Sequence, residues 1–383
     1  MTAQLTYLDH AATTPMRREA LDAMLPFLSD RFANPSGAYR SGRDARRAID
    51  EARDVVAEVI GCPPGDVVFT GSGTEADNTV IAGVTAARGG EPLCSAAEHH
   101  AVLEPVRRAG GRVVGTDALG RIDLDQLATE LTRADAVPAS LVSVMAVNNE
   151  VGTLTDLAAV SQLVRHLAPG AALHTDAVQA ACWLDLRELM PLVDFLSLSA
   201  HKFGGPKGVG ILAARRGVGF QPLMVGGGQE RERRSGTQNV AGIVATAVAL
   251  QLADAERDHE RSRVTGLRDR FVDALAGRCD GTHETVPRDA KVAGSAHVCI
   301  EGVENEALLF LLDEAGVCAS AASACASGAM EPSHVLAAMG VDPQLARGAI
   351  RFTLGRATTV DDVDRAVDVT ADAVVRLRGA VAR

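Results

Sequence analysis

The chain has 383 residues, of which 47% are hydrophobic and 23% charged, a globular composition with room for about two domains. Its formal net charge of −11 argues against a general nucleic-acid-binding protein, because such proteins present a basic surface. The N-terminus has no basic start followed by an apolar segment, and no apolar run approaches the ~20 residues that cross a bilayer. We therefore expect a cytoplasmic protein that binds neither nucleic acid nor membranes.

Short apolar runs alternate with amphipathic segments from about residue 66 to residue 215, a pattern typical of an α/β layer with a mainly parallel sheet. Strands are predicted at residues 66–70, 140–147, 171–174 and 193–198, and helices from about residue 74 and over 157–167. In open sheets of this type, ligands bind at the carboxyl ends of the strands. Polar residues at those ends are therefore candidate site residues.

A long predicted helix over residues 239–276 leads out of this layer. A smaller α+β domain is then predicted from strands at 296–300 and 349–354 and helices at 304–315 and 360–381. We place the large domain at residues 15–257 and the small C-terminal domain at 258–383, joined by the N-terminal segment 1–14.

A lysine follows directly after the predicted strand at 193–198, in the sequence Ser199-Ala200-His201-Lys202. A lysine at the exit of a buried strand, with hydroxyl and imidazole groups beside it, suits an amine that forms a Schiff base with pyridoxal phosphate. Taken alone, such a lysine is more often a solvated loop residue. The interpretation therefore depends on the ends of the other strands.

Two further strand ends carry groups that suit the same cofactor. The sequence Gly71-Ser72-Gly73-Thr74-Glu75 lies between a strand and a helix, where glycines and free N–H groups bind a phosphate. A plain tight turn with Thr74 as helix cap is the alternative. Asp176 follows a buried strand and suits a protonated pyridine nitrogen, with Gln179 in reach of the ring hydroxyl, although Asp176 could instead be a helix cap.

Polar residues also follow the remaining strands. Asn148-Asn149-Glu150 ends one predicted strand, with a plain Asn-Asn turn as the alternative, and Glu98-His99-His100 supplies a stacking imidazole. A histidine pair also occurs in metal sites, but no further ligands accompany this pair at the usual spacing. Together the strand ends favour a pyridoxal phosphate site, with no resident metal.

Seven scattered cysteines, none in a Cys-x-x-Cys pattern, indicate free thiols rather than a disulfide framework. One of them, Cys325, lies among alanines and serines at 318–329, so small side chains leave its thiol sterically open. No basic residue flanks Cys325, so its neighbours give no evident reason for a lowered pKa. A short Ala/Ser helix with an incidental cysteine is the alternative. Cys318 ends an apolar strand and is expected to face the core.

Taken together, these motifs resemble the NifS/IscS-type cysteine desulfurases, which are fold type I pyridoxal phosphate enzymes of the class V aminotransferase superfamily. The resemblance covers essentially the whole chain, and its motifs lie at residues 7–15, 34–36, 69–78, 98–102, 147–152, 176–179, 199–208, 226–231, 234–237, 323–325 and 350–352. It implies a large domain with a mainly parallel seven-stranded sheet. One departure is Ala322, where many relatives have a glycine before Ser-Ala-Cys.

The resemblance also implies roles for individual residues. Lys202 would carry the Schiff base, Asp176 would pair with the pyridine nitrogen, and His99 would stack on the ring and exchange protons. The ring oxygen region would be held by Gln179 and Asn149, and the phosphate by Thr74, Ser199 and His201 with the backbone at Gly73. Thr237 would reach the phosphate in the neighbouring subunit, which implies a homodimer. Asn34 and Arg351 would hold the substrate carboxylate.

The implied reaction removes sulfur from L-cysteine, giving L-alanine and a persulfide on the nucleophile Cys325. That sulfur would pass to an acceptor protein for iron–sulfur cluster assembly, another thio-cofactor or tRNA thiolation, and Cys325 could transiently ligate a cluster. Three alternatives stay open: a selenocysteine lyase, an aminotransferase on the same fold, and a non-catalytic sulfur-transfer component.

Overall fold

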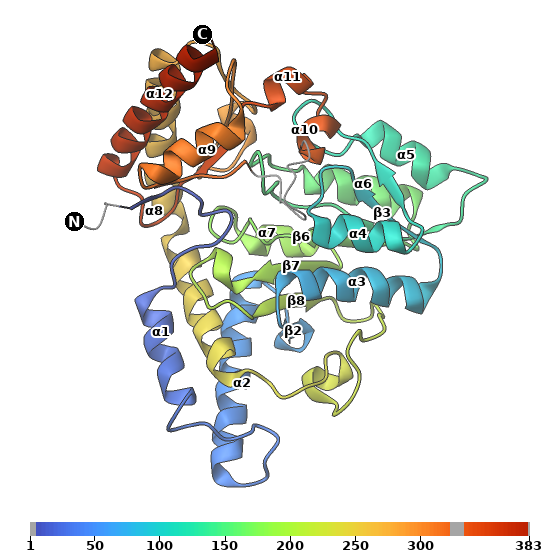
Figure 1. Cartoon of the computed structure of the whole chain (residues 1–383). Helices are drawn as coiled ribbons and strands as arrows, with labels where there is room; N and C mark the ends of the chain where they lie inside the picture. Colours follow the sequence, from blue (N-terminus) through green and yellow to red (C-terminus); the bar gives the residue numbers. More distant parts are fainter. Residues whose placement is uncertain (1–4, 322–332, 382–383) are drawn as a thin grey trace.

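The structure, a computed structural model, describes residues 5–321 and 333–381. Figure 1 shows a large lobe built around one sheet and a smaller lobe, coloured orange to red, above it. Helix α8 (Val240–Arg278) runs from the first lobe into the second. Within the described ranges, no helix combines the length and the apolarity that a bilayer crossing needs.

The large sheet has seven strands in the order β2-β8-β7-β6-β5-β3-β4, and only β8 runs antiparallel to its neighbours. The expected α/β class with a mainly parallel seven-stranded sheet is therefore confirmed. In sheet order the strands are Val67–Thr70, Gly210–Ala214, Phe195–Ser199, Ala172–Asp176, Ala139–Ser143, Glu91–Ser95 and Arg112–Val114.

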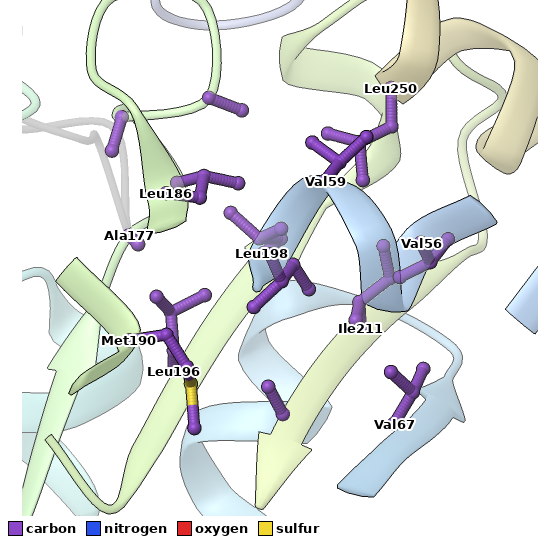
Figure 2. Close-up of a cluster of buried hydrophobic side chains, with 14 of the residues drawn as sticks. Val56, Val59, Val67, Ala177, Leu186, Met190, Leu196, Leu198, Ile211 and Leu250 are labelled. Carbon is purple, nitrogen blue, oxygen red and sulfur yellow. The ribbon is translucent and has the colours of Figure 1, made fainter. Parts of the chain in front are cut away.

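Helices cover both faces of this sheet. On one face, α2 (Arg40–Ile60) and α8 pack over an apolar cluster in which Val56 and Val59 lie near Leu198 and Ile211 (Figure 2). On the other face, α3 (Gly73–Arg88) and α4 (His100–Arg108) cover a second cluster. The remaining large-lobe helices are α1 (Arg18–Met24), α5 (Leu124–Thr132), α6 (Leu157–Leu167) and α7 (Leu186–Leu189). The doubly covered sheet explains why β2, β8, β7 and β6 are buried at every residue.

The small lobe contains an antiparallel sheet in the order β12-β10-β9, with strands Ala349–Thr353, Ser295–Ile300 and Thr282–Glu284. Its core includes Phe271 of α8 and Phe352 of β12, whose ring centroids are 4.7 Å apart. The lobe also contains the helices α9 (Asn305–Glu314), α10 (His334–Ala338), α11 (Pro343–Ala346) and α12 (Val360–Val381).

The N-terminal segment joins the two lobes. Its strand β1 (Thr6–Tyr7) pairs in parallel with β11 (Val317–Cys318), and the fully buried Leu8 belongs to the small-lobe core. The chain then enters the large lobe, where Arg17 N–H donates to the carbonyl of Gly204 at 2.8 Å. The division that we predict between residues 257 and 258 falls inside α8, and it stays a prediction.

Candidate active site

The predicted phosphate-binding turn lies at the N-terminus of α3, beside the end of β7. A Cβ atom on Gly73 would lie 2.8 Å from Val178 Cγ2 and 3.2 Å from Ser199 Cβ, so only glycine fits without displacement. Thr74 is exposed at this helix end. The helix cap is Ser72 rather than Thr74, because the Ser72 hydroxyl accepts a hydrogen bond from the Glu75 N–H at 3.0 Å. The backbone of residues 73–74 is thus available to a phosphate.

Lys202 ends a short 3₁₀ turn (Ala200–Lys202) directly after β7. Its Nζ donates to the carbonyl oxygens of Ala11 and Ala12, at 3.0 Å in the second case, so the N-terminal segment holds the amine in place. Burial and, secondarily, the positive charge of Arg351 lower the pKa of Lys202 to about 8. An amine with a lowered pKa is more often unprotonated near neutral pH, as a Schiff-base lysine must be.

Asp176 ends β6 in a buried position and accepts a hydrogen bond from the Val178 N–H at 2.9 Å. Burial is the main reason why its pKa is raised, while the Val178 N–H and Lys202 oppose that shift. Two more buried carboxyl groups, Asp77 and Glu98, also have pKa values raised by burial and by the charge of Asp176. A cationic ring nitrogen at Asp176 would oppose the effect of burial and favour the ionised form of this carboxyl group.

A fully buried histidine lies in the strand that ends in Asp176. His174 Nδ1 lies 2.8 Å from Ser143 Oγ, and its Nε2 lies 3.0 Å from Ser197 Oγ and 3.5 Å from Asp77 Oδ1. Burial lowers the pKa of His174 to about 3, so the ring is neutral. These four side chains come from β5, β6, β7 and α3 and form one buried polar cluster. The cluster fixes the end of β6, where Asp176 lies.

His99 is the N-terminal cap of α4, and its Nδ1 accepts a hydrogen bond from the Ala101 N–H at 3.0 Å. That contact places the ring proton on Nε2. The imidazole surface is exposed, yet the protein packed around it, and then the charge of Lys202, lower the pKa of His99 to about 4. His99 is therefore a neutral ring with a free Nε2–H, which suits stacking on an aromatic cofactor.

Two amide side chains lie beside Lys202. Gln179 Nε2 donates to the Ala11 carbonyl at 2.8 Å. The Oδ1 atom of Asn149 is buried without a hydrogen-bond partner. Because an unpartnered buried acceptor is costly, Asn149 fits a ligand that brings a donor. His201 lies on the same side, with its Nδ1 3.1 Å from Thr13 Oγ1.

Arg351, in the middle of β12, brings a buried guanidinium to the same region. Its Nη2 contacts Asp9 Oδ1 at 2.7 Å and its Nη1 donates to the Asn149 carbonyl at 2.8 Å. Its buried Nε has no hydrogen-bond partner. A guanidinium with unused N–H donors is suited to a planar carboxylate.

A solvent-open cavity of about 990 Å³ lies between residues of the two lobes. Its lining includes Asn149, Gln179, Lys202 and Thr353, whereas Asp176, His99 and Arg351 lie outside the lining. The structure thus brings Lys202, Gln179 and Asn149 together around one space, and Arg351 contacts this group through its bond to the Asn149 carbonyl.

Two residues that we singled out lie away from this group, and a third is not among the described residues. Asn34 is exposed in the loop that joins α1 to α2, at the end of the large lobe away from the small lobe (Figure 1). Thr237 is exposed in the segment before α8 and lines a separate small cavity with Thr70 and Gly71. Cys325 lies outside the described residues.

Sequence reasoning missed two kinds of site residue. The carbonyl groups of Ala11 and Ala12 hold Lys202, and no side-chain pattern marks a functional carbonyl. The buried pair of Asp77 and His174 did carry a signal, because each is an ionisable residue next to apolar residues in a buried strand or on the buried face of a helix.

Comparison with known proteins extends over nearly the whole chain. Residues 6–366 match the family model of class-V aminotransferases. The chain is 42% identical over 380 residues to cysteine desulfurase IscS of Dictyoglomus turgidum, covering 97% of this chain and 95% of that protein. It is also 42% identical to an IscS-like cysteine desulfurase of Mycobacterium tuberculosis, covering 98% of each.

Solved structures agree with these relatives. A NifS-like protein superposes with a TM-score of 0.89 at 34% identity, covering 97% of this chain and 100% of that one. The structure of SspA in complex with cysteine superposes with a TM-score of 0.76 at 30% identity, covering 92% of this chain and all of that one. Fold and site together define an enzyme of the class-V aminotransferase type, a family that is generally pyridoxal phosphate-dependent. Within it, the chain belongs to the cysteine desulfurases, as its motifs predict.

Proposed function

We propose that this protein binds pyridoxal phosphate at Lys202 and Asp176 and removes sulfur from L-cysteine through Cys325. The observation that carries the proposal is that a low-pKa lysine, a buried carboxylate and a guanidinium with an unused N–H lie within electrostatic reach of one another. The residues fit the cofactor. Gly73 leaves space at the start of α3 that a Cβ atom would fill, and the buried Asn149 Oδ1, which has no partner, can accept a hydrogen bond from the cofactor. When bound, the cofactor supplies an electron sink for the amino acid.

Other steps of the reaction, which are substrate binding and proton transfer, are assigned to individual residues of the chain. Arg351 binds the substrate carboxylate with its unused N–H donors, and Asp9 holds the guanidinium in place. Asp176 keeps a proton on the ring nitrogen, and Lys202 takes the substrate α-proton on Nζ. The carbonyls of Ala11 and Ala12 orient the Nζ atom for this transfer.

The sulfur transfer belongs to Cys325, which matches the family motif Ser-Ala-Cys at residues 323–325. Its thiolate forms an S–S bond with the substrate sulfur while the substrate Cβ–S bond breaks. The electron pair of the broken bond stays with the carbon chain, which takes up a proton and leaves as L-alanine. The persulfide on Cys325 then passes its outer sulfur to an acceptor protein.

Replacement of the nucleophile tests this assignment. Cys325→Ala is expected to keep the Schiff-base absorbance of the loaded protein and to form no protein-bound persulfide from labelled cysteine. Cys318→Ser, at the nearest described cysteine, is the matched control and should retain persulfide formation. Alanine production at the wild-type rate by the Cys325→Ala variant with a persulfide-accepting thiol present would disprove the role of Cys325.

We also propose that the protein is a homodimer with shared sites. Thr237 does not meet the Lys202 group of its own chain, and the resemblance places it at the phosphate of a second copy. The large exposed side chains of Leu28, Phe32 and Val225 support this proposal, because apolar groups of that size tend to be covered in an assembly.

A further inference from the structure

The segment that leads to Thr237 contains a backbone conformation that the activity does not explain. Glu230, Arg231 and Glu232 have φ angles of 50°, 55° and 65°, all in the left-handed region. Residues with a Cβ atom rarely adopt this conformation even singly. Three in succession persist only where the surrounding structure holds them.

Glu230 provides that restraint from a buried position. Its Oε2 and Oε1 atoms accept bonds from Arg53 Nη1 and Nη2, each at 2.8 Å, and Oε2 also accepts the Phe69 N–H at 3.0 Å. The side chains of Arg53 and Glu230 are only 6% and 1% exposed. Arg53 is itself fixed by a bond to the Val67 carbonyl at 2.8 Å. A bidentate pair of this kind has one geometry only.

The same carboxylate reaches the neighbour of Thr237. Gln238 Nε2 donates to Glu230 Oε1, so the residue after Thr237 is tied to the buried pair. On the other side of Thr237, Gly236 N–H donates to Gln229 Oε1 at 2.9 Å. Thr237 therefore lies between two residues that are hydrogen-bonded to Gln229 and Glu230, at the start of the left-handed turn. An exposed hydroxyl on a loop needs such restraint to bind at one fixed place.

We propose that Glu230 is a positioning residue: together with Arg53 it locks the left-handed turn at 230–232 so that Thr237 binds the cofactor phosphate of the partner subunit. This inference rests on the proposed function, and it adds a buried ion pair that serves the site of the other subunit. The proposal predicts an effect in trans: a substitution at Glu230 in one subunit should weaken cofactor binding in the other subunit.

Mixed dimers separate the two subunits. In each mixed dimer one subunit carries Lys202→Ala, so that the only Schiff-base absorbance comes from the intact subunit. Glu230→Gln is then placed either on the Lys202→Ala subunit, in trans to the reporting site, or on the intact subunit, in cis. Release of pyridoxal phosphate is followed as loss of that absorbance. We expect release about tenfold faster in trans, as for the loss of one hydrogen bond to a charged group, and unchanged in cis.

Two further variants serve as a control and as a replacement for Glu230→Gln. Glu232→Gln changes an exposed glutamate of the same turn and should leave the release rate unchanged. If Glu230→Gln does not fold because Arg53 is left unpaired, Gln238→Leu removes one hydrogen bond that a neutral amide donates to Glu230, and it should still accelerate release in trans. Equal release in both arrangements, or acceleration in cis alone, would overturn the inference. Failure of the wild-type protein to dimerise or to form a Schiff base would instead overturn the proposed function.

Discussion

The amine of Lys202 has its reactivity set by position rather than by sequence neighbours. Burial lowers its pKa from 10.5 to about 8, and Arg351 adds to that shift although it lies 149 positions further along the chain. Asp176 and Asp9 oppose the shift, so the four charges define one electrostatic unit. The motif after β7 identifies this lysine, but the charges that tune it come from three other segments.

This shift has a consequence for stability in the cofactor-free protein. Between pH 8 and 10.5 the unfolded chain keeps a proton on Lys202 that the folded chain has released, so stability gained from this group rises with pH. In Lys202→Met the free energy of unfolding should lack this rise, which amounts to at most about 3 kcal/mol. Urea unfolding at several pH values measures the difference. The exposed Lys207→Met is the control, and a wild-type-like rise in Lys202→Met would contradict the expectation.

At the scale of single residues, the sequence predicted that Asp176, Gln179 and Lys202 follow buried strands, and the structure has them at or just after the ends of the adjacent strands β6 and β7. It did not identify the contact between Asp9 and Arg351, since those residues meet only through the pairing of the N-terminal segment with β12. Their roles in binding stay predictions. The chemical type of each side chain can be read directly from the sequence, whereas its contacts with distant residues depend on how the strands are arranged in the fold.

Among the elements, those with strong periodicity were predicted closely. α6 and α12 have the predicted bounds, and α8 begins one residue after the expected start because Asn239 caps it by accepting the Gly242 N–H at 3.0 Å. The strand predicted over 140–147 is shorter, since β5 ends at Ser143. The apolar run continues, but Val147 turns to form a bridge with Leu154, which an apolar pattern cannot reveal.

A substitution in the first turn of α3 tests whether cofactor binding requires the close packing at Gly73. Gly73→Ala would place a methyl group 2.8 Å from Val178 Cγ2 and so displace the turn that we predict to bind the phosphate. We expect pyridoxal phosphate affinity to fall about tenfold or more while the far side of the sheet stays folded. Equilibrium titration of the cofactor-free protein measures this fall.

The control is another glycine-to-alanine change within a helix. Gly266 lies inside α8 with nothing within 4 Å of an added Cβ, so Gly266→Ala should stabilise the helix by about 0.5–1 kcal/mol. Its cofactor affinity should equal that of the wild type. Equal affinities in both variants would show that the turn at Gly73 does not contact the phosphate.

On the scale of the whole molecule, the N-terminal segment couples the lobes. Leu8 N–H donates to the Cys318 carbonyl at 3.0 Å, and the Thr353 N–H donates to the Leu8 carbonyl at 2.7 Å. A few residues later, Ala11 and Ala12 hold Lys202 of the large lobe. The proposed substrate anion site and the proposed cofactor-binding amine therefore depend on one continuous stretch of backbone.

Shortening of the buried Leu8 side chain tests this coupling. Leu8→Ala should lower the free energy of unfolding by about 2–5 kcal/mol, as expected for a large-to-small change in a core. Hydrogen exchange should also accelerate at the amides of β12. Leu5→Ala, at a residue that is 65% exposed, should change neither quantity. Acceleration confined to the large lobe would refute the coupling.

The same segment also sets the order in which parts of the protein can come together. Asp9 and its partner Arg351 are 342 positions apart in the chain. The proposed carboxylate site cannot form until both segments have been synthesised and have met. Its completion is therefore a long-range step of folding, which local structure alone cannot achieve.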